Sequence, residues 1–382
     1  MTSPTETTIH GHCDPRFEAV RNEFVRNFSD RHESGAAVAV RIDGELVVDL
    51  WGGMADHRQA RPWTRDSVQL VFSTTKGLAA ACALLLWQWG QLDIDAPVAS
   101  YWPAFGAAGK ERITARHLMT HQAGLAAFTE RVSVEDCHRP GWAAAQLATQ
   151  TPDWEPGSAH GYHALTYGWL LGEVVARASG RSLGAFLAEE IAGPLGAEAW
   201  IGLPPALEPR VSRLTSVASS SVPDQSLEAF NQALMTKGSL TRRVFSNPSQ
   251  QQGVFNEPAL HAAEWPAANG IATATGLARI YEAMVSGELL SAATVEAART
   301  PQSTGMDLVL QRDTCFGLGF MLPNASSIMR GGGFGHPGAG GSLAFGDCRT
   351  GISFAYVMSA MDHGHTNDPR CRALVDAAYA SL

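Results

Sequence analysis

Residues 36–54 consist of two runs rich in β-branched and other apolar residues, with polar positions between them. Short runs of this kind are typical of β-strands. The dipeptide Asp43-Gly44 separates the two runs, and it favours the type I′ turn that closes a two-residue hairpin. The pattern therefore predicts a β-hairpin over residues 36–54.

A different pattern follows from residue 77 up to Gly90, where almost every position is apolar. A helix that is apolar on all sides is buried on all sides, so we expect a central buried helix here. Residues 113–200 have a mainly helical pattern, which proline and glycine interrupt at intervals. Residues 206–258 are richer in serine, glutamine, asparagine and proline. We interpret them as a long, weakly structured excursion and a candidate lid.

Strand-like runs return toward the C-terminus, and a short helical pattern ends the chain. We expect strands over residues 316–322, 342–346 and 351–358, and a terminal helix over residues 374–382. Strands at both ends of the chain, with helices between them, predict one α/β domain that carries a helical insertion.

The composition narrows the class of protein. Of the 382 residues, 45% are hydrophobic and 17% are charged, so the chain can bury a large core. A net charge of −9 without a basic stripe argues against nucleic acid as a partner. No apolar run reaches the length of a membrane span, and the polar N-terminus does not look like a signal peptide. Six cysteines without a Cys-x-x-Cys pair fit free thiols, so we expect a cytoplasmic protein without a membrane partner.

Ser73 and Lys76 form the most informative short motif of the chain. At a spacing of three residues, their side chains share one face of a helix. A lysine amine in that position can accept the serine proton if burial or a neighbouring cation lowers its pKa. The sequence has only three lysines against 25 arginines, and arginine cannot act as a base. The alternative is a serine that caps a helix and an ordinary lysine in its first turn.

Two further segments can bring polar groups to the same site. Tyr162 follows the turn Pro156-Gly157 and precedes a helical pattern, so its hydroxyl can reach a cleft. A tyrosine relays a proton, or acts as a base where cations lower its pKa of about 10. The glycine-rich run 335–342 leads into a strand, where a free amide beside that of Ser73 would form an oxyanion hole. Taken alone, these are a packing tyrosine and a glycine-rich loop.

Together, Ser73-Thr-Thr-Lys76, the tyrosine element and the glycine-rich run before a strand resemble the penicillin-recognising serine enzymes. The chain resembles the class C β-lactamase-like group, and most closely the family VIII carboxylesterases within it. The likeness covers roughly residues 20–380. It includes four more segments, residues 92–98, 113–125, 167–174 and 194–196.

The resemblance implies a fold of the β-lactamase/DD-peptidase type, in which an antiparallel sheet is flanked by helices and a mainly helical insertion is added. We expect residues 1–70 together with 260–382 to form the α/β domain. Residues 71–259 are then the mainly helical domain, and the active site lies at the interface of the two.

The resemblance also implies a role for each motif. Ser73 is the nucleophile, Lys76 is its activating partner, and Tyr162 is the proton relay or base. The backbone amides of Ser73 and Ala339 form the oxyanion hole. The motif leaves open whether Lys76 or Tyr162 accepts the first proton. The family implies no cofactor and no metal.

The sequence departs from the class C pattern at two places. Where class C enzymes have an asparagine two residues after the tyrosine, this chain has Ala164, and it has His336-Pro337-Gly338 where they typically have Lys-Thr-Gly. A mostly neutral histidine and a proline hold a substrate carboxylate poorly. This puts efficient β-lactam turnover in doubt and favours an uncharged ester. We expect His336, Gly338 and Phe128 to contact the substrate.

The sequence therefore predicts a serine carboxylesterase that hydrolyses short-chain esters through an acyl-enzyme on Ser73. The alternatives are an acyltransferase that uses the same acyl-enzyme, and a β-lactamase or D-amino-acid peptidase or amidase. The partner is then a small-molecule ester. The sequence does not predict the acyl and alcohol groups, the stereoselectivity or the oligomeric state.

Two other motifs have simpler explanations. Gly180-Arg-Ser182-Leu-Gly184 matches the Gly-x-Ser-x-Gly nucleophile elbow, but that elbow needs a strand before it. A helical pattern precedes Ser182 here, so we interpret Ser182 as a helix N-cap. His117 and His121 have a spacing that metal ligands also use, yet no acidic third ligand accompanies them. We expect capping and packing roles for both.

Overall fold

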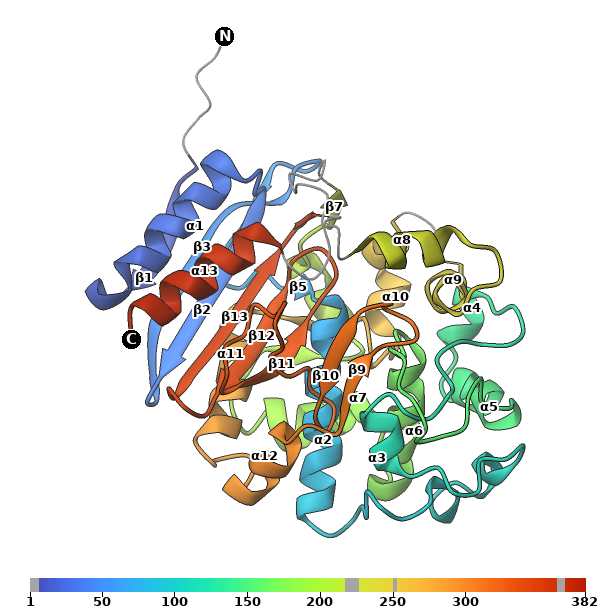
Figure 1. Ribbon diagram of the computed structural model, residues 1–382. Helices are drawn as coiled ribbons and strands as arrows, with labels where there is room; N and C mark the ends of the chain where they lie inside the picture. The colour runs from blue at the N-terminus through green and yellow to red at the C-terminus, as the bar shows by residue number, and fades with distance from the viewer. Residues whose placement is uncertain (1–6, 217–226, 250–252, 363–367) are drawn as a thin grey trace.

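The computed structural model of the protein describes residues 7–216, 227–249, 253–362 and 368–382. Its central feature is an antiparallel sheet with the strand order β1-β3-β2-β13-β12-β11, in which β4 also pairs with β3. β2 lies beside β13, so strands from the two ends of the chain meet in the middle of the sheet (Figure 1).

The strands of the main sheet are β1 (Ile9–Cys13), β2 (Gly35–Ile42), β3 (Glu45–Asp56), β4 (Arg61–Pro62), β11 (Gly333–Pro337), β12 (Leu343–Asp347) and β13 (Ile352–Met358). Three small sheets lie outside it. They are formed by β5 (Gln69–Leu70), β8 (Ile271–Ala272) and β6 (Ala199–Trp200), by β9 (Ser303–Met306) and β10 (Asp313–Phe316), and by β7 (Thr215–Ser216) and β14 (Ala360–Met361).

The α-helices of the described part of the chain are mostly short. They are α1 (Glu18–Asp30), α2 (Thr75–Gln88), α3 (Ala115–Met119), α4 (Val134–Cys137), α5 (Trp142–Thr149), α6 (Thr166–Ser179), α7 (Leu183–Phe186), α8 (Glu228–Met235), α9 (Leu240–Ser246), α10 (Pro258–Ala262), α11 (Ala274–Val285), α12 (Ala292–Arg299) and α13 (Pro369–Ala380).

The hairpin predicted for residues 36–54 is confirmed as β2 and β3. Asp43 and Gly44 join these strands and both have positive φ, 51° and 87°. A type I′ turn requires positive φ at both of its central residues, and Asp-Gly is one of the pairs that adopt it readily. The turn therefore fixes the register of the two strands, which pair from Gly35 to Ile42.

The two faces of the sheet carry side chains of different size, because successive residues of a strand point to opposite faces. α1 and α13 lie side by side over one face (Figure 1). Large buried side chains of the strands pack there, among them Val38, Val40, Leu50, Phe345 and Phe354. α11 packs on the other face, where the sheet presents small residues that allow a close approach, namely Ala39, Ala344 and Ala355.

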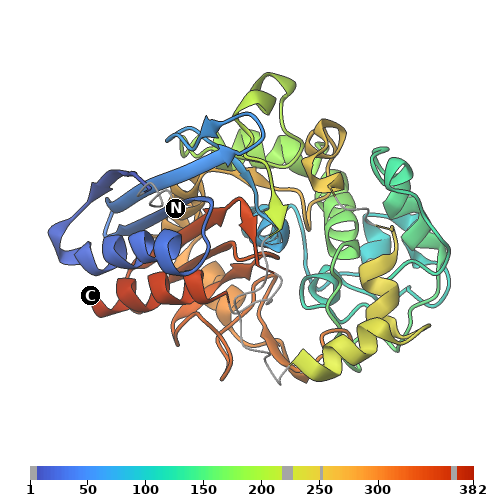
Figure 2. The same cartoon turned by 90° about the horizontal axis from the view of Figure 1, so that it is seen from above.

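α2 is the buried central helix that the apolar pattern predicts. Every residue from Thr75 to Leu86 is buried, whereas Trp89, just after the helix, is 43% exposed. α2 packs against α6 and α7, and its N-terminal end reaches β11. Figure 2 shows α2 between the sheet and the remaining helices. The N-terminus of α2 therefore lies where the sheet and the helical part of the chain meet.

Two expectations about local structure are wrong. Residues 206–258 are not weakly structured throughout, because their described part contains α8 and α9 and the start of α10; residues 217–226 and 250–252 lie outside the described residues. Residues 316–322 do not form one strand, because the extended segment ends at Phe316. A turn follows, in which Gly319 has a φ of 83° and approaches Ala80 so closely that an added Cβ would lie 2.4 Å from the Cβ of Ala80.

The described strands of the main sheet come from residues 9–62 and 333–358, as expected for an α/β domain built from both ends of the chain. The domain boundaries near residues 70 and 260 stay a prediction. Within the described ranges, none of the helices combines the length and the apolar character that a membrane span needs.

Candidate active site

Ser73 lies in a tight turn at the entrance to α2. The residue before it, Phe72, has a φ of +46°, a value that residues other than glycine rarely adopt. A 3-10 turn over Phe72–Thr74 then leads directly into α2. The hydroxyl of Thr75 accepts a hydrogen bond from Gly270 N at 2.8 Å, which ties the turn to the segment before β8. Ser73 is thus held at the positive end of the helix dipole, which favours an oxyanion.

The amine of Lys76 is fully buried and has three oxygen neighbours. Its Nζ lies 2.7 Å from the carbonyl oxygen of Ala164, 3.0 Å from that of Ala267 and 3.3 Å from Ser73 Oγ. Burial lowers the pKa of Lys76 well below its usual value. A neutral amine has two N–H donors, which the two carbonyls accept, and one lone pair, which then faces Ser73.

Tyr162 lies on the other side of the nucleophile. Its phenol is near enough to Ser73 for the two hydroxyls to interact, and Lys76 Nζ lies 4.7 Å from the centre of its ring. Burial raises the pKa of the Tyr162 phenol above its usual value, which favours its protonated form. Whether Tyr162 relays a proton or accepts one stays a prediction. The geometry brings Ser73, Lys76 and Tyr162 together, and burial favours the uncharged form of both the amine and the phenol.

The position of Tyr162 depends on a residue that the sequence reasoning missed. Asp307 is fully buried, and one of its carboxylate oxygens accepts hydrogen bonds from the amides of Tyr162 (3.0 Å), Val309 and Leu310 (both 2.8 Å). A carboxylate that accepts several backbone N–H groups fixes the segments that donate them. No local motif marks Asp307, because its partner lies 145 residues away.

The glycine-rich segment packs directly against the nucleophile turn. An added Cβ at Gly338 would lie 2.3 Å from the carbonyl oxygen of Val71, so no other residue fits there. Ser342 Oγ donates to that same oxygen at 2.9 Å. The next residue, Ala339, lines one cavity together with Ser73. Neither the Ser73 nor the Ala339 amide has an acceptor among the described residues, so both are free for an oxyanion.

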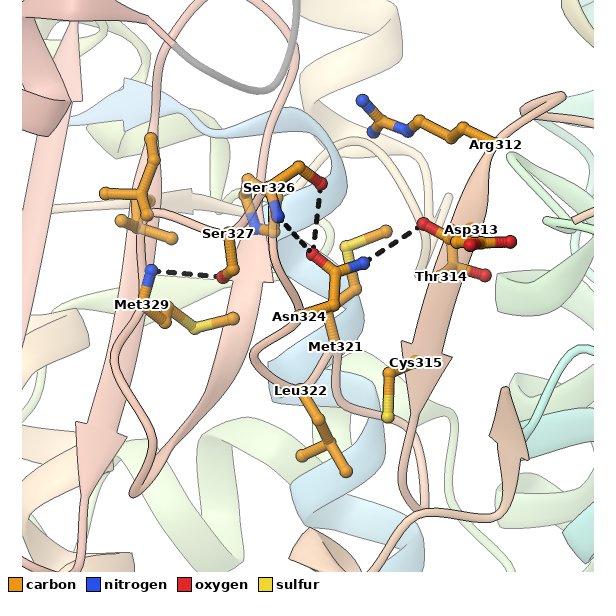
Figure 3. Close-up of a pocket in the computed structure, with 13 residues that line it drawn as sticks. Arg312, Asp313, Thr314, Cys315, Met321, Leu322, Asn324, Ser326, Ser327 and Met329 are labelled. Carbon is orange, nitrogen blue, oxygen red and sulfur yellow. Dashed lines mark hydrogen bonds between the residues drawn. The ribbon is translucent and has the colours of Figure 1, made fainter. Parts of the chain in front are cut away.

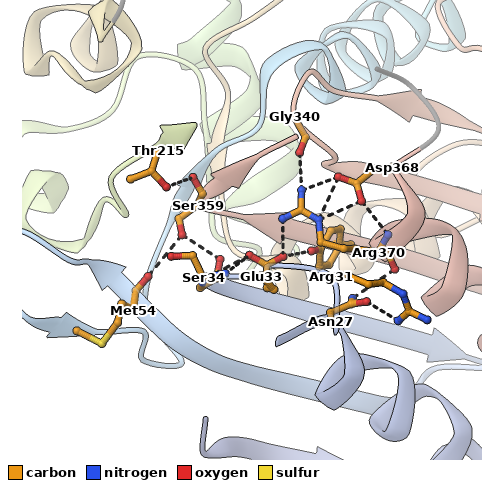
Figure 4. A network of polar contacts seen from close by, with 12 residues as sticks. Asn27, Arg31, Glu33, Ser34, Met54, Thr215, Gly340, Ser359, Asp368 and Arg370 are labelled. Atoms are coloured by element: carbon orange, nitrogen blue, oxygen red, sulfur yellow. Dashed lines mark hydrogen bonds and ion pairs between the residues drawn. The ribbon is translucent and has the colours of Figure 1, made fainter. Parts of the chain in front are cut away.

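A buried ionic network holds this loop from behind (Figure 4). Arg370, which follows the N-cap Asp368 of α13, donates to the carbonyl oxygen of Gly340 at 3.0 Å. The same guanidinium pairs with Asp368 at 2.5 Å and with Glu33 at 3.2 Å, and Tyr356 donates to Glu33. A buried pair whose hydrogen bonds are all satisfied is rigid, so the loop with the predicted oxyanion amide has a fixed support.

The three residues predicted to contact the substrate lie deeper than expected. Among the described residues, the lining of the cavity around Ser73 does not include His336, Gly338 or Phe128. His336 stacks on the ring of Tyr162 with the ring centres 5.9 Å apart, and Phe128 packs on Trp169. The structure thus gives these residues supporting and packing positions, and their contact with a substrate stays a prediction.

His336 is buried beside Tyr162 and has a low pKa. Its side chain is only 1% exposed, and its burial, together with the nearby Lys76, lowers its pKa to about 3. A fall of pH to about 6.5, where an exposed histidine becomes charged, therefore supplies no cation at this position.

The cavity that contains Ser73 has a volume of about 760 Å³. Its apolar wall includes Phe72, Leu214, Phe245 and Phe255. Its size and mixed lining are those of a site for a small molecule. Arg58 and Arg213 also line it, and no sequence motif singled them out.

A second cavity lies beside β10 and is shown in Figure 3. Its volume is about 50 Å³, which is room for water but not for an ester. Asn324 bridges it by donating to the carbonyl oxygen of Asp313 at 3.0 Å and accepting from Ser326. None of the three predicted catalytic residues lines this cavity.

The two alternative motifs have structural roles. Ser182 caps α7 by accepting a hydrogen bond from Ala185 N, and it donates to Glu264 at 2.5 Å. His117 completes the capping of α3, and His121 is buried with its ring 5.0 Å from that of Tyr162. Over the residues that the structure describes, no three side chains of metal-ligating type come together.

Comparison with known proteins agrees with this geometry. Residues 21–379 match the β-lactamase family. The chain belongs to that family. This β-lactamase-family protein is 37% identical over 361 residues to the esterase/β-lactamase LipL of Mycobacterium tuberculosis, an alignment that spans 91% of this chain and 82% of LipL.

Three solved structures resemble this chain over nearly its whole length. A family VIII carboxylesterase superimposes with a TM-score of 0.89 at 36% identity, over 98% of this chain and 100% of the other. A penicillin-binding protein homologue from Caulobacter crescentus gives 0.86 at 37% identity, over 98% and 100%. EstA from Arthrobacter nitroguajacolicus Rue61a gives 0.83 at 32% identity, over 97% and 98%. The resemblance and the fold predicted from the sequence are therefore confirmed, and the protein is a serine hydrolase with esterase relatives.

Proposed function

We propose that this protein is a serine carboxylesterase that hydrolyses short-chain carboxylic esters through an acyl-enzyme on Ser73. The observation that carries the proposal is the environment of Lys76. Two carbonyl oxygens accept the two N–H donors of its buried amine, and the remaining lone pair faces Ser73 Oγ at 3.3 Å. A neutral amine in that position is a general base for the serine hydroxyl.

In the first step, the proton of Ser73 moves to Lys76 while Oγ forms a bond with the carbonyl carbon of the ester. The carbonyl oxygen becomes an oxyanion, and the free amides of Ser73 and Ala339 donate to it. When the oxyanion collapses, the bond to the leaving alkoxide breaks. Tyr162 gives its phenolic proton to the alkoxide and regains one from the ammonium of Lys76.

In the second step, water attacks the acyl carbon and loses its proton to the amine of Lys76. A second oxyanion forms in the same hole and collapses, which breaks the bond between the acyl carbon and Oγ. Ser73 Oγ takes this proton from the ammonium of Lys76, and the carboxylic acid leaves. We assign the base to Lys76 and the proton donor to Tyr162, because a lowered pKa makes the neutral amine available to accept a proton and a raised pKa keeps the phenol protonated.

Esters fit this site better than β-lactams do. The carboxylate of a penicillin is on the carbon bonded to the scissile nitrogen, so it lies beside the reaction centre. At the place where the family's lysine would hold it, this chain has an uncharged, buried His336 followed by Pro337. A charge-assisted bond of about 1.5–3 kcal/mol is therefore missing.

A substrate panel tests the proposal. The kcat/KM of the wild-type protein is measured for 4-nitrophenyl acetate, butanoate and octanoate, for nitrocefin, and for a D-alanine 4-nitroanilide. We expect the two shorter esters to give the highest values. A higher kcat/KM for nitrocefin or for the anilide would instead support the β-lactamase or the D-amino-acid amidase. Methanol added to the ester assay shows whether the acyl group passes to water or to an alcohol.

Replacement of Tyr162 by phenylalanine is expected to lower kcat for the short-chain esters by a factor on the order of 10²–10⁴, because the proton donor is lost while the ring remains. Tyr281→Phe is the matched control, since its hydroxyl is also buried but has no hydrogen-bond partner in the described residues. The control is expected to keep its activity. A Tyr162→Phe variant within a factor of two of the wild type would show that Tyr162 only packs.

A further inference from the structure

The wall of the cavity around Ser73 carries a positive charge. Arg58 and Arg213 line it, and the residues that the structure describes in this wall include no aspartate and no glutamate. Arg213 N donates to the carbonyl oxygen of Ala55 at 2.7 Å, so the segment that carries Arg213 lies beside the end of β3, close to Arg58 in the sequence. A positive wall is unexpected in a chain with a net charge of −9.

Within the described ranges, neither guanidinium takes part in a hydrogen bond or an ion pair. The neighbouring carboxylate of Asp56 accepts from the backbone N of Arg58 at 2.8 Å, not from its guanidinium. By contrast, Arg210 pairs with Glu198 at 2.7 Å and Arg65 with Asp49 at 3.0 Å. Among the contacts that the structure describes, Arg58 and Arg213 thus differ from Arg210 and Arg65 in having no carboxylate partner.

We propose that Arg58 and Arg213 form a subsite for a carboxylate that the substrate carries at the end remote from the scissile bond. The substrates of this class are half-esters of dicarboxylic acids and esters of carboxylated alcohols. The proposal rests on the ester hydrolysis proposed above and specifies its substrate class.

The chemistry of the cavity fits such a molecule. Planar guanidinium groups bind carboxylates through paired N–H donors, and two of them suit one carboxylate. The apolar residues Leu214, Phe245 and Phe255 line the same cavity, where they can cover an alkyl chain or an aryl ring. The subsite is separate from the position of His336, which is buried and does not line the cavity. An ester that has no carboxylate beside its reactive bond can therefore still be an anionic substrate, with its carboxylate at the remote end.

The test compares matched pairs of substrates that differ only in one charge. On the acyl side, the pair is 4-nitrophenyl hydrogen adipate and methyl 4-nitrophenyl adipate, in which the remote carboxylate is a methyl ester. On the alcohol side, the pair is 4-acetoxybenzoate and its methyl ester. For each pair, kcat/KM is measured at low and at high salt in the wild type, in Arg58→Gln, in Arg213→Gln and in the double variant. Arg112→Gln is the control, because Arg112 is exposed and does not line the cavity.

In the wild type we expect the anionic member of one pair to be preferred by about ten- to a hundredfold, as charge-assisted hydrogen bonds predict. The preference falls at high salt, because salt screens exposed charges. The double variant loses the preference, so its kcat/KM for the anionic member falls to about that for the neutral member. Arg112→Gln keeps the preference. The pair that shows it identifies the side of the ester to which the subsite belongs.

Two results overturn the inference. One is hydrolysis of both members of both pairs without a preference for the anion, and the other is a preference that survives in the double variant.

If none of the esters is hydrolysed, the proposed function fails but the subsite is still tested. In that case, binding of 3-carboxyphenylboronic acid and of phenylboronic acid is measured by calorimetry. The subsite is rejected if the wild type binds the two boronic acids with equal affinity. It is also rejected if the wild type and the double variant show the same difference in affinity between the two boronic acids.

Discussion

Replacement of Ser73 by alanine is expected to lower kcat/KM for short-chain esters by a factor on the order of 10⁴ or more, because no acyl-enzyme can form. The protein should remain folded, since Ser73 is only half-buried and its side chain meets few groups besides Lys76 and Tyr162. Initial rates on 4-nitrophenyl butanoate, together with the circular dichroism of the variant, check both statements.

Ser182→Ala is the control for this experiment, because Ser182 belongs to the Gly-x-Ser-x-Gly motif. The variant loses the cap of α7, which typically contributes about 0.5–2 kcal/mol of stability, and its turnover should stay near the wild-type value. A mass shift after reaction with a fluorophosphonate should occur in Ser182→Ala and not in Ser73→Ala. The opposite labelling pattern would make Ser182 the nucleophile.

Replacement of Lys76 by arginine is expected to be nearly as damaging as the loss of Ser73. A guanidinium keeps the positive charge but cannot be deprotonated, so it cannot accept the serine proton. Because the larger side chain also perturbs a fully buried site, Lys76→Met is measured beside it. A stably folded Lys76→Arg variant with most of the wild-type activity would exclude Lys76 as the base.

The pH profile of the wild type gives an independent check of this role. Burial lowers the pKa of Lys76, so the amine is neutral above the lowered value and charged below it. Activity must therefore rise with pH through that value, since only the neutral amine has a free lone pair. An activity that instead rises with acidity over this range contradicts a lysine base. His336 does not contribute to the profile near neutrality, because its pKa is about 3.

The features that the sequence predicted well depend on short spacings. Ser73 and Lys76 are three residues apart, so helix geometry alone brings them together, and Asp43-Gly44 specifies its own turn. The contacts that position the Lys76 amine could not be predicted in this way. Its partners are the carbonyl oxygens of Ala164 and Ala267, and a backbone oxygen carries no signal in the sequence.

Contacts between distant segments of the chain explain why the sequence analysis missed Arg58 and Arg213 and misplaced His336. Arg58 and Arg213 face one cavity only because the segment after Val211 pairs with the end of β3, a contact between distant parts of the chain. His336 was expected at the surface of the site, since its motif aligns with a substrate-binding lysine. Its ring instead fills the space behind Tyr162. Spacing predicts which residues share an element, whereas depth in the fold depends on packing between elements.

The pairing of β2 with β13 also determines when the enzyme can become active during its synthesis. The ribosome makes the turn with Ser73 early and β13 almost last. The edge of β2 that pairs with β13 therefore stays unpaired for roughly 15 to 60 s at ordinary elongation rates. Throughout that time the nascent chain exposes an unpaired strand edge, which is prone to aggregate unless a chaperone or a transient fold covers it. The loop with the predicted oxyanion amide, before β12, and its support Arg370 emerge in the same final interval. A ribosome-bound chain therefore carries Ser73 and Lys76 long before the site around them is complete, and we expect a chain that ends before β12 to be inactive.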